Sequence, residues 1–214
     1  MLEEATRIVL IRHGETAWNR ATRIQGHTDI PLSTLGLAQA ERLAEALADE
    51  PLTAIYSSDL SRARQTAEAL GRSRNLAIRL DAGLRERAFG RFEGLSWEEI
   101  DQGYPEDAAR WRRREPDFPV GGGESLTVFS ARCLAAARRA AAAHPGEGIA
   151  LVAHGGVLDC LYRAATQVAL DAPRSWQLGN ATINRLLATS EGFTLVGWND
   201  DRHLAGLTAD DIAA

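Results

Sequence analysis

The sequence contains no lysine, so all 24 of its basic residues are arginines. A chain without lysine cannot form a Schiff base with a substrate and lacks the lysine of a P-loop. Positive charge for binding an anion must therefore come from guanidinium groups or from histidine. Together with abundant alanine, the arginine bias is also typical of a GC-rich bacterial genome.

Cysteine and long apolar segments are scarce as well. Cys133 and Cys160 lie in helix-like apolar stretches without a Cys-x-x-Cys spacing, so we expect reduced core thiols. No paired-histidine spacing indicates a metal site, and we expect no cofactor. No apolar run approaches the roughly 20 residues that span a bilayer, and the acidic N-terminus does not resemble a signal peptide. We therefore expect a cytoplasmic protein without a membrane partner.

The charge balance excludes another class of protein. The formal net charge is −5, whereas a nucleic-acid-binding protein is usually basic or carries a basic stripe. The 214 residues, of which 45% are hydrophobic, suffice for one domain with a sizeable core. We expect a single α/β domain over residues 1–214 and no nucleic-acid partner.

Strand-like and helix-like segments alternate along the chain. The expected strands cover residues 7–12, 54–57, 77–80 and 149–153, and the expected helices cover 33–48, 61–71, 124–143 and 157–168, with a hairpin of 181–188 and 193–198 at the end. This alternation predicts a three-layer α/β/α fold with a mostly parallel central sheet. Residues 87–123 interrupt it with many glycines and prolines, and we expect them to form a small helical lid at the carboxyl edge of the sheet.

Two of the apolar strands end in a histidine followed by glycine. Residues 8–11 lead into Arg12-His13-Gly14, and residues 149–153 lead into His154-Gly155-Gly156. Because the carboxyl ends of parallel strands meet at one edge of the sheet, both imidazoles can reach the same ligand. Histidine is suited to nucleophilic attack or proton transfer near neutral pH.

Two more charged residues follow strands in the same way. Arg62 comes shortly after the second strand, in the first turn of its helix, where both the helix dipole and a guanidinium favour an anion. Glu86 follows the third strand and adds a carboxyl group at a similar depth. The four strand ends therefore predict one composite anion site.

Taken together, these segments resemble the histidine phosphatase superfamily, also called the phosphoglycerate mutase-like family. The matching motifs are RHGETAWN, SSDLSRARQTA, LRE followed by FGRFEG, GGES and VAHGG, in the order of the family and over roughly residues 7–160. Each motif alone is weak, but five in sequence are specific.

The resemblance implies a role for each matching residue. His13 matches the nucleophile that takes a phosphoryl group, and Arg12, Arg62 and His154 match the cationic pocket around it. Glu86 matches the proton donor to the leaving oxygen, which becomes the base for water. Chemically, His13 must be neutral, with its spare ring nitrogen bonded to a carbonyl, Glu86 must begin protonated, and a protonated His154 must help the arginines.

The resemblance also implies substrate contacts outside this group. Asn19 matches a further phosphate-contacting side chain, and Gly155 matches a backbone amide donor. Gln25 and Gly26 fall where the family contacts the rest of the substrate. The expected partner is a small phosphorylated metabolite, and a homodimer is possible because dimers are common in the family.

The family includes both phosphatases and 2,3-bisphosphoglycerate-dependent mutases. The mutases usually carry His-Tyr after the Glu-Arg pair and a lysine shortly afterwards, where this chain has Ala88-Phe89 and Trp97. Their inserted shielding segment is short or absent here. We therefore expect a metal-independent phosphomonoester hydrolase, with a mutase as the alternative and a non-catalytic phospho-ligand binding protein as a remote one.

The arginine-rich segment Arg110–Arg114 leaves two interpretations open. It is either a solvated helix face or part of a lid that recognises a second acidic group on the substrate. Trp18, Trp97, Trp111 and Phe89 would instead suit a substrate with an apolar part.

Overall fold

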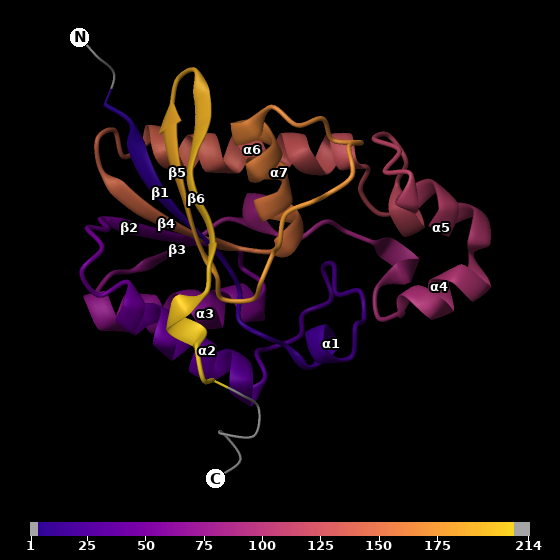
Figure 1. The fold of residues 1–214 in the computed structure, drawn as a ribbon, viewed down its shortest axis with the longest axis horizontal. Coiled ribbons are helices and arrows are strands. Elements are labelled where there is room, and N and C mark those ends of the chain that lie inside the picture. The colour runs from indigo at the N-terminus through magenta and orange to yellow at the C-terminus, as the bar shows by residue number, and fades with distance from the viewer. Residues whose placement is uncertain (1–3, 208–214) are drawn as a thin grey trace.

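The computed structural model describes residues 4–207, in which one mixed sheet has helices on both faces (Figure 1). The strands are β1 (Thr6–Arg12), β2 (Ala54–Ser57), β3 (Ile78–Leu80), β4 (Gly148–Ala153), β5 (Ile183–Thr189) and β6 (Gly192–Asp200). The α-helices are α1 (Ala17–Arg20), α2 (Thr34–Ala46), α3 (Ser61–Arg74), α4 (Trp97–Gly103), α5 (Pro105–Arg112), α6 (Leu126–Ala142) and α7 (Gly155–Thr166).

The strand order is β3-β2-β4-β1-β5-β6. The first four strands run parallel, and β5 and β6 add an antiparallel edge. Helices α6 and α7 cover one face, and α2 and α3 cover the other (Figure 1). This arrangement confirms the predicted three-layer fold with a mostly parallel sheet.

The alternation of side chains along β1 explains why both faces are covered. Ile8 and Leu10 pack into a core with α6 and α7, whereas Val9 and Ile11 pack into a second core with α2 and α3. All four are buried. A strand that is apolar on both faces is typical of a parallel sheet between helical layers.

Several predicted boundaries shift for local reasons. Helix α3 continues past Gly71 to Arg74, where Asn75 in the left-handed region (φ 53°) ends it. Strand β5 begins at Ile183 because Ala181 also has a positive φ, of 53°. Helix α6 begins after Ser125, whose hydroxyl accepts from the amide of Val128, and α7 begins at Gly155 rather than at residue 157.

Residues 87–123 contain two short helices, α4 and α5, as predicted. They lie to one side of the layered body, beyond the ends of α6 and α1 (Figure 1). Their own small core holds Phe92, Ile100, Ala108, Phe118 and Val120. Whether they act as a lid stays a prediction, as does the division of the chain into domains.

Candidate active site

His13 is held at the end of β1 with one ring nitrogen occupied. Its Nδ1 lies 2.7 Å from the carbonyl oxygen of Gly14, and because a carbonyl can only accept, Nδ1 carries the proton. The other nitrogen, Nε2, is then left with its lone pair. This is the arrangement that the sequence predicts for a nucleophile, and the imidazole is 97% buried, with 3% exposed.

His154 lies at the end of β4, next to His13. The two ring centroids are 5.1 Å apart, at an interplanar angle of 61°. Arg62 Nε donates to His154 Nδ1 at 3.2 Å, so the ring proton is on Nε2, which donates to the hydroxyl of Ser58 at 2.8 Å. The Arg62 guanidinium is fully buried and also donates to the carbonyls of Gly26 and Thr28.

Both histidines favour the neutral form in this structure. Burial, reinforced by Arg62 and Arg12, holds the pKa of His13 well below its ordinary value. Burial, Arg62 and the neighbouring His13 do the same to the pKa of His154. The expectation of a protonated His154 concerns the site with a phosphate bound, and there it stays a prediction; in this structure burial of the ring, together with the neighbouring cations, favours the neutral form. A phosphate dianion beside it would favour the protonated form again.

Arg12 joins this group from the last position of β1. Its Nη1 donates to the carbonyl of Leu178, while its Nε is buried without a hydrogen-bond partner among residues 4–207. Burial, with Arg174 and Arg62 adding to it, lowers the pKa of Arg12 to about 10. A buried, unpaired guanidinium nitrogen beside two imidazoles is consistent with a site for an anion.

Glu86 reaches the same cavity from the segment after β3. Its Oε2 accepts from the amide of Gly156 at 3.1 Å, and its Oε1 accepts from the amide of Arg87 at 2.8 Å. A Cβ at Gly156 would lie 2.2 Å from Oε1, so only glycine admits the carboxyl group here. The carboxyl group therefore lies against the first turn of α7, directly after His154.

The remaining predicted residues also line this cavity. Asn19 accepts from the amide of Thr16 in a capping box at the start of α1. Gln25 is buried, with no hydrogen-bond partner for its Oε1 among the described residues. Gly26 (φ 55°) offers its carbonyl to Arg62, and Gly155 lies against Arg12. The cavity brings all nine predicted site residues together: Arg12, His13, Asn19, Gln25, Gly26, Arg62, Glu86, Gly155 and, through its contact with Arg62, His154.

A metal ion has no evident site within residues 4–207. No group of three or more histidine, cysteine, aspartate or glutamate side chains is arranged there to hold one. The charged residues that line the cavity are instead mostly cationic: Arg12, Arg23, Arg62, Arg87, Arg114 and Arg174, against Glu86 and Asp159. The cavity has a volume of about 830 Å³.

A family model described as the histidine phosphatase superfamily (branch 1) matches residues 8–201. The chain belongs to this superfamily. The confirmed resemblance thus extends beyond the motifs to the closing hairpin.

Individual relatives of the superfamily include both phosphatases and mutase-like proteins. Phosphoglycerate mutase-like protein 4 of Arabidopsis thaliana is 39% identical over 92% of this chain and 86% of its own. The metal-independent phosphoserine phosphatase of the same plant is 37% identical over 95% and 85%. The structure of a mycobacterial glucosyl-3-phosphoglycerate phosphatase is 33% identical and covers 92% of this chain and all of its own, with a TM-score of 0.82. Family and relatives support a phosphatase of the histidine phosphatase superfamily.

The superfamily motifs do not include every residue that shapes this site. Asn180 Nδ2 donates to the carbonyl of His13 at 2.9 Å, and the Ala181 amide donates to that of Arg12 at 3.0 Å. Arg174 and Trp176, from the same loop before β5, line the cavity. Nothing in the sequence of this loop marks it as part of a site, because only the pairing of β5 with β1 brings it there.

The structure also places the cysteines, the arginine-rich segment and the aromatic residues that the sequence singles out. Cys133 and Cys160 are buried and free, as predicted. The arginine-rich segment divides: Arg110, Arg112 and Arg113 form exposed ion pairs, whereas Arg114 bonds Asp159 at 3.0 Å and lines the cavity. Of the aromatic residues, Phe89, Trp97 and Trp111 line it too. None of the helices among the described residues is long and apolar enough to cross a membrane.

Proposed function

We propose that the protein hydrolyses small phosphomonoesters through a phosphohistidine on His13. His13 Nε2 attacks the phosphorus, the bond to the leaving oxygen breaks, and Glu86 gives that oxygen its proton. Water then attacks the phosphorus, the P–N bond breaks, and Glu86 takes the proton from the water. Arg12, Arg62 and His154 stabilise the charge on the transferring phosphoryl group.

The tautomer and the lowered pKa of His13 give this proposal its strongest support. The Gly14 carbonyl fixes the tautomer of His13, and the lowered pKa keeps the ring neutral, so its free nitrogen stays nucleophilic beside the Arg62–His154 pair. Glu86 lines the same cavity and can serve as the acid. A binding protein without turnover would need neither a nucleophile in the correct tautomer nor a carboxyl group in a cationic cavity.

Asn19, Gln25, Gly26 and Gly155 would hold the substrate around this centre. Asn19 and Gly155 would contact the phosphoryl group, and Gln25 and Gly26 the remainder of the substrate. Six arginines against two carboxylates favour a substrate with acidic groups. Arg174 lines the cavity and would bind a second acidic group, together with Arg114, which also bonds Asp159.

A 2,3-bisphosphoglycerate-dependent mutase is the second candidate, because the same cationic cavity suits a bisphosphate and some relatives carry mutase names. A panel of metabolite phosphates, assayed with and without 2,3-bisphosphoglycerate, separates the two. We expect phosphate release without the bisphosphate. Interconversion of 3- and 2-phosphoglycerate that needs the bisphosphate, without phosphate release, would establish the mutase instead.

We further propose that this is a cytoplasmic, bacterial protein and that it forms a homodimer. We also propose that the chain is a single domain in which residues 87–123 act as a lid. The two free, buried cysteines support a reducing compartment. The separate small core of residues 87–123 supports a lid that moves as a unit. Light scattering of the purified protein tests the dimer.

A further inference from the structure

Glu86 lies in irregular backbone, so its position depends on side chains from other elements. A short 3-10 turn, Ala82–Leu84, precedes it, and residues 85–89 belong to no helix or strand. A catalytic group usually needs firmer support, because a displacement of about 1 Å can cost roughly 10²-fold in rate. The contacts that fix this segment therefore bear on catalysis.

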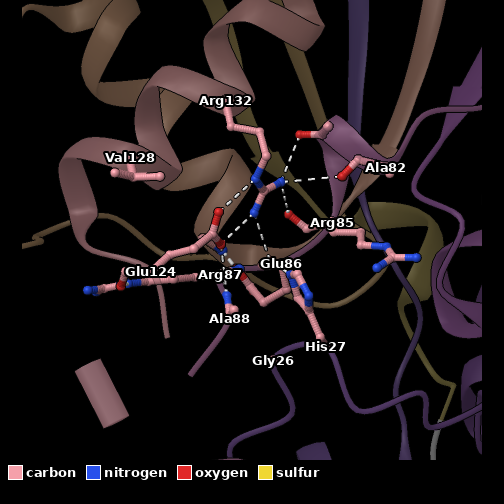
Figure 2. A network of polar contacts seen from close by, with 12 residues as sticks. Gly26, His27, Ala82, Arg85, Glu86, Arg87, Ala88, Glu124, Val128 and Arg132 are labelled. Carbon is pink, nitrogen blue, oxygen red and sulfur yellow. Dashed lines mark hydrogen bonds and ion pairs between the residues drawn. The ribbon is translucent and has the colours of Figure 1, made fainter. Parts of the chain in front are cut away.

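Arg132, on α6, supplies most of these contacts (Figure 2). Its Nη1 donates to the carbonyls of Gly83 and Arg85, both at 3.0 Å, and its Nη2 donates to that of Glu86 at 3.1 Å. Its Nε and Nη2 also donate to the two carboxylate oxygens of Glu124, at 2.9 Å and 2.7 Å. All five N–H groups of the guanidinium thus have an acceptor, which fixes the plane of the fork.

Glu124 holds the other end of the same segment. Its Oε2, already bonded to Arg132, accepts from the amide of Ala88 at 2.9 Å (Figure 2). Its own amide donates to the carbonyl of Ala88 at 2.9 Å, and its carbonyl accepts from Arg87 Nε at 2.8 Å. The Arg132–Glu124 pair therefore spans residues 83–88, with Glu86 in the middle.

The carbonyl of Glu86 is bonded from a second direction as well. His27 Nε2 lies 2.8 Å from it, in the loop whose carbonyls at Gly26 and Thr28 accept from Arg62. The carboxyl end of the side chain is bonded to the amide of Gly156. Hydrogen bonds therefore fix both the backbone and the carboxyl group of Glu86. The loop of residues 26–28 contacts the carbonyl of Glu86 and also Arg62 in the candidate anion site.

A general stabilising role does not account for this concentration of contacts. The side chains of Arg132 and Glu124 are 24% and 18% exposed, and an ion pair near the surface contributes little to the free energy of unfolding. Arg139, on the same helix, forms an ordinary ion pair of this kind with Asp81 at 3.1 Å. Arg132 instead donates to three backbone carbonyls of one segment, those of Gly83, Arg85 and Glu86.

We propose that Arg132 and Glu124 are positioning residues that hold Glu86 against the leaving oxygen of the substrate. This inference rests on the proposed function, in which Glu86 is the proton donor. Neither Arg132 nor Glu124 is among the residues that line the cavity. Loss of the pair should therefore slow only reactions whose leaving group needs a proton.

The test compares an alkyl phosphate with p-nitrophenyl phosphate in Arg132→Met. We expect kcat for the alkyl ester to fall about 10- to 100-fold, since general acid catalysis contributes 10²–10⁴-fold, and kcat for the nitrophenyl ester to change little. KM and inhibition by inorganic phosphate should stay near those of the parent protein. Arg132→Lys and Glu124→Gln, which each keep part of the network, should show smaller shifts of the same kind.

Arg139→Met is the matched control, because it removes an ion pair from the same helix without touching residues 85–88. It should leave the ratio of the two rates unchanged. In a Glu86→Gln background, Arg132→Met should add no further loss, since it acts through Glu86.

Different results would overturn different claims. If Glu86→Gln slows both esters equally, the acid role fails, and the positioning proposal with it. If Glu86→Gln slows the alkyl ester more than the nitrophenyl ester but Arg132→Met slows both equally, only the positioning proposal is overturned. The same holds if the double variant loses the product of the two single fold-losses in kcat. If Arg132→Met does not fold, the same comparison of kcat for the two esters is made with Arg132→Lys and Glu124→Gln.

Discussion

The imidazoles of His13 and His154 meet edge to face because their strands are paired in register. In the parallel pair β1–β4, Arg12 is opposite Ala153, so the next residue on each strand is a histidine. The amide of His13 donates to the carbonyl of Ala153 at 3.0 Å, which continues the pairing to the site itself. A shift by one residue on either strand would separate the rings.

Replacing His13 by alanine should abolish turnover. Without an imidazole no phosphoenzyme forms, and we expect activity to fall by at least about 10³-fold. Rapid acid-free quench of the parent protein with a 32P-labelled substrate should trap an acid-labile phosphoprotein that His13→Ala lacks. A phosphoprotein that persists in the variant would place the nucleophile on another residue.

Activity should not depend on a divalent metal. Arginines line the cavity, and no metal-ligating cluster is found among residues 4–207. Rates of phosphate release measured after dialysis against excess EDTA should equal those before it. Loss of activity that Mg²⁺ or Zn²⁺ restores would contradict the proposed mechanism.

Stability should fall as the pH drops below about 6.5, the ordinary pKa of histidine. His13 and His154 have folded-state pKa values well below that, so at pH 7.5 both states are neutral and neither contributes. Below 6.5 the unfolded chain binds protons that the native protein does not, which costs up to about 1.4 kcal/mol per pH unit for each histidine. Urea unfolding between pH 7.5 and 5.5 measures the slope, which should be shallower in His154→Asn. An unchanged slope in that variant would contradict the lowered pKa of His154.

Replacing Gly156 by alanine should displace Glu86 without removing any catalytic group. The added Cβ would lie 2.2 Å from Glu86 Oε1 and 2.9 Å from Phe129, and the flexible carboxyl group can move more easily than the ring. Hydrolysis of alkyl phosphates should slow about 10-fold or more, and that of p-nitrophenyl phosphate much less. Equal losses for both esters would indicate a general disturbance of α7. Gly103→Ala, at a position with open space around it, is the control.

The sequence predicts those parts of the site that follow directly from a strand end. His13, Arg62, Glu86 and His154 each come within a few residues of a buried strand, so local pattern and parallel topology suffice to bring them together. The tautomer of His13 was predictable as well, because a nucleophilic imidazole needs its other nitrogen occupied. The lowered pKa of His154 was not, since it depends on how deeply the ring is buried and on how close Arg62 lies to it.

Contacts that depend on tertiary packing could not be predicted. Asn180 reaches His13 only because β5 pairs with β1, and Arg132 reaches Glu86 from a helix more than 40 positions away along the chain. Similarly, Arg110–Arg114 divides into exposed ion pairs and one inward residue because Arg114 has a positive φ, of 54°, that no local pattern indicates.

The place of β1 in the sheet also has a consequence for the order of folding. Of the strands within residues 4–207 it is synthesised before the others, yet both of its neighbours, β4 and β5, come from residues 148–189. During synthesis β1, which ends beside the candidate nucleophile His13, therefore cannot pair with its neighbouring strands until most of the polypeptide has been made. A nascent chain that stops before residue 178 would lack Leu178, Asn180 and Ala181, which hydrogen-bond to Arg12 and His13. We expect such a chain to have no phosphatase activity.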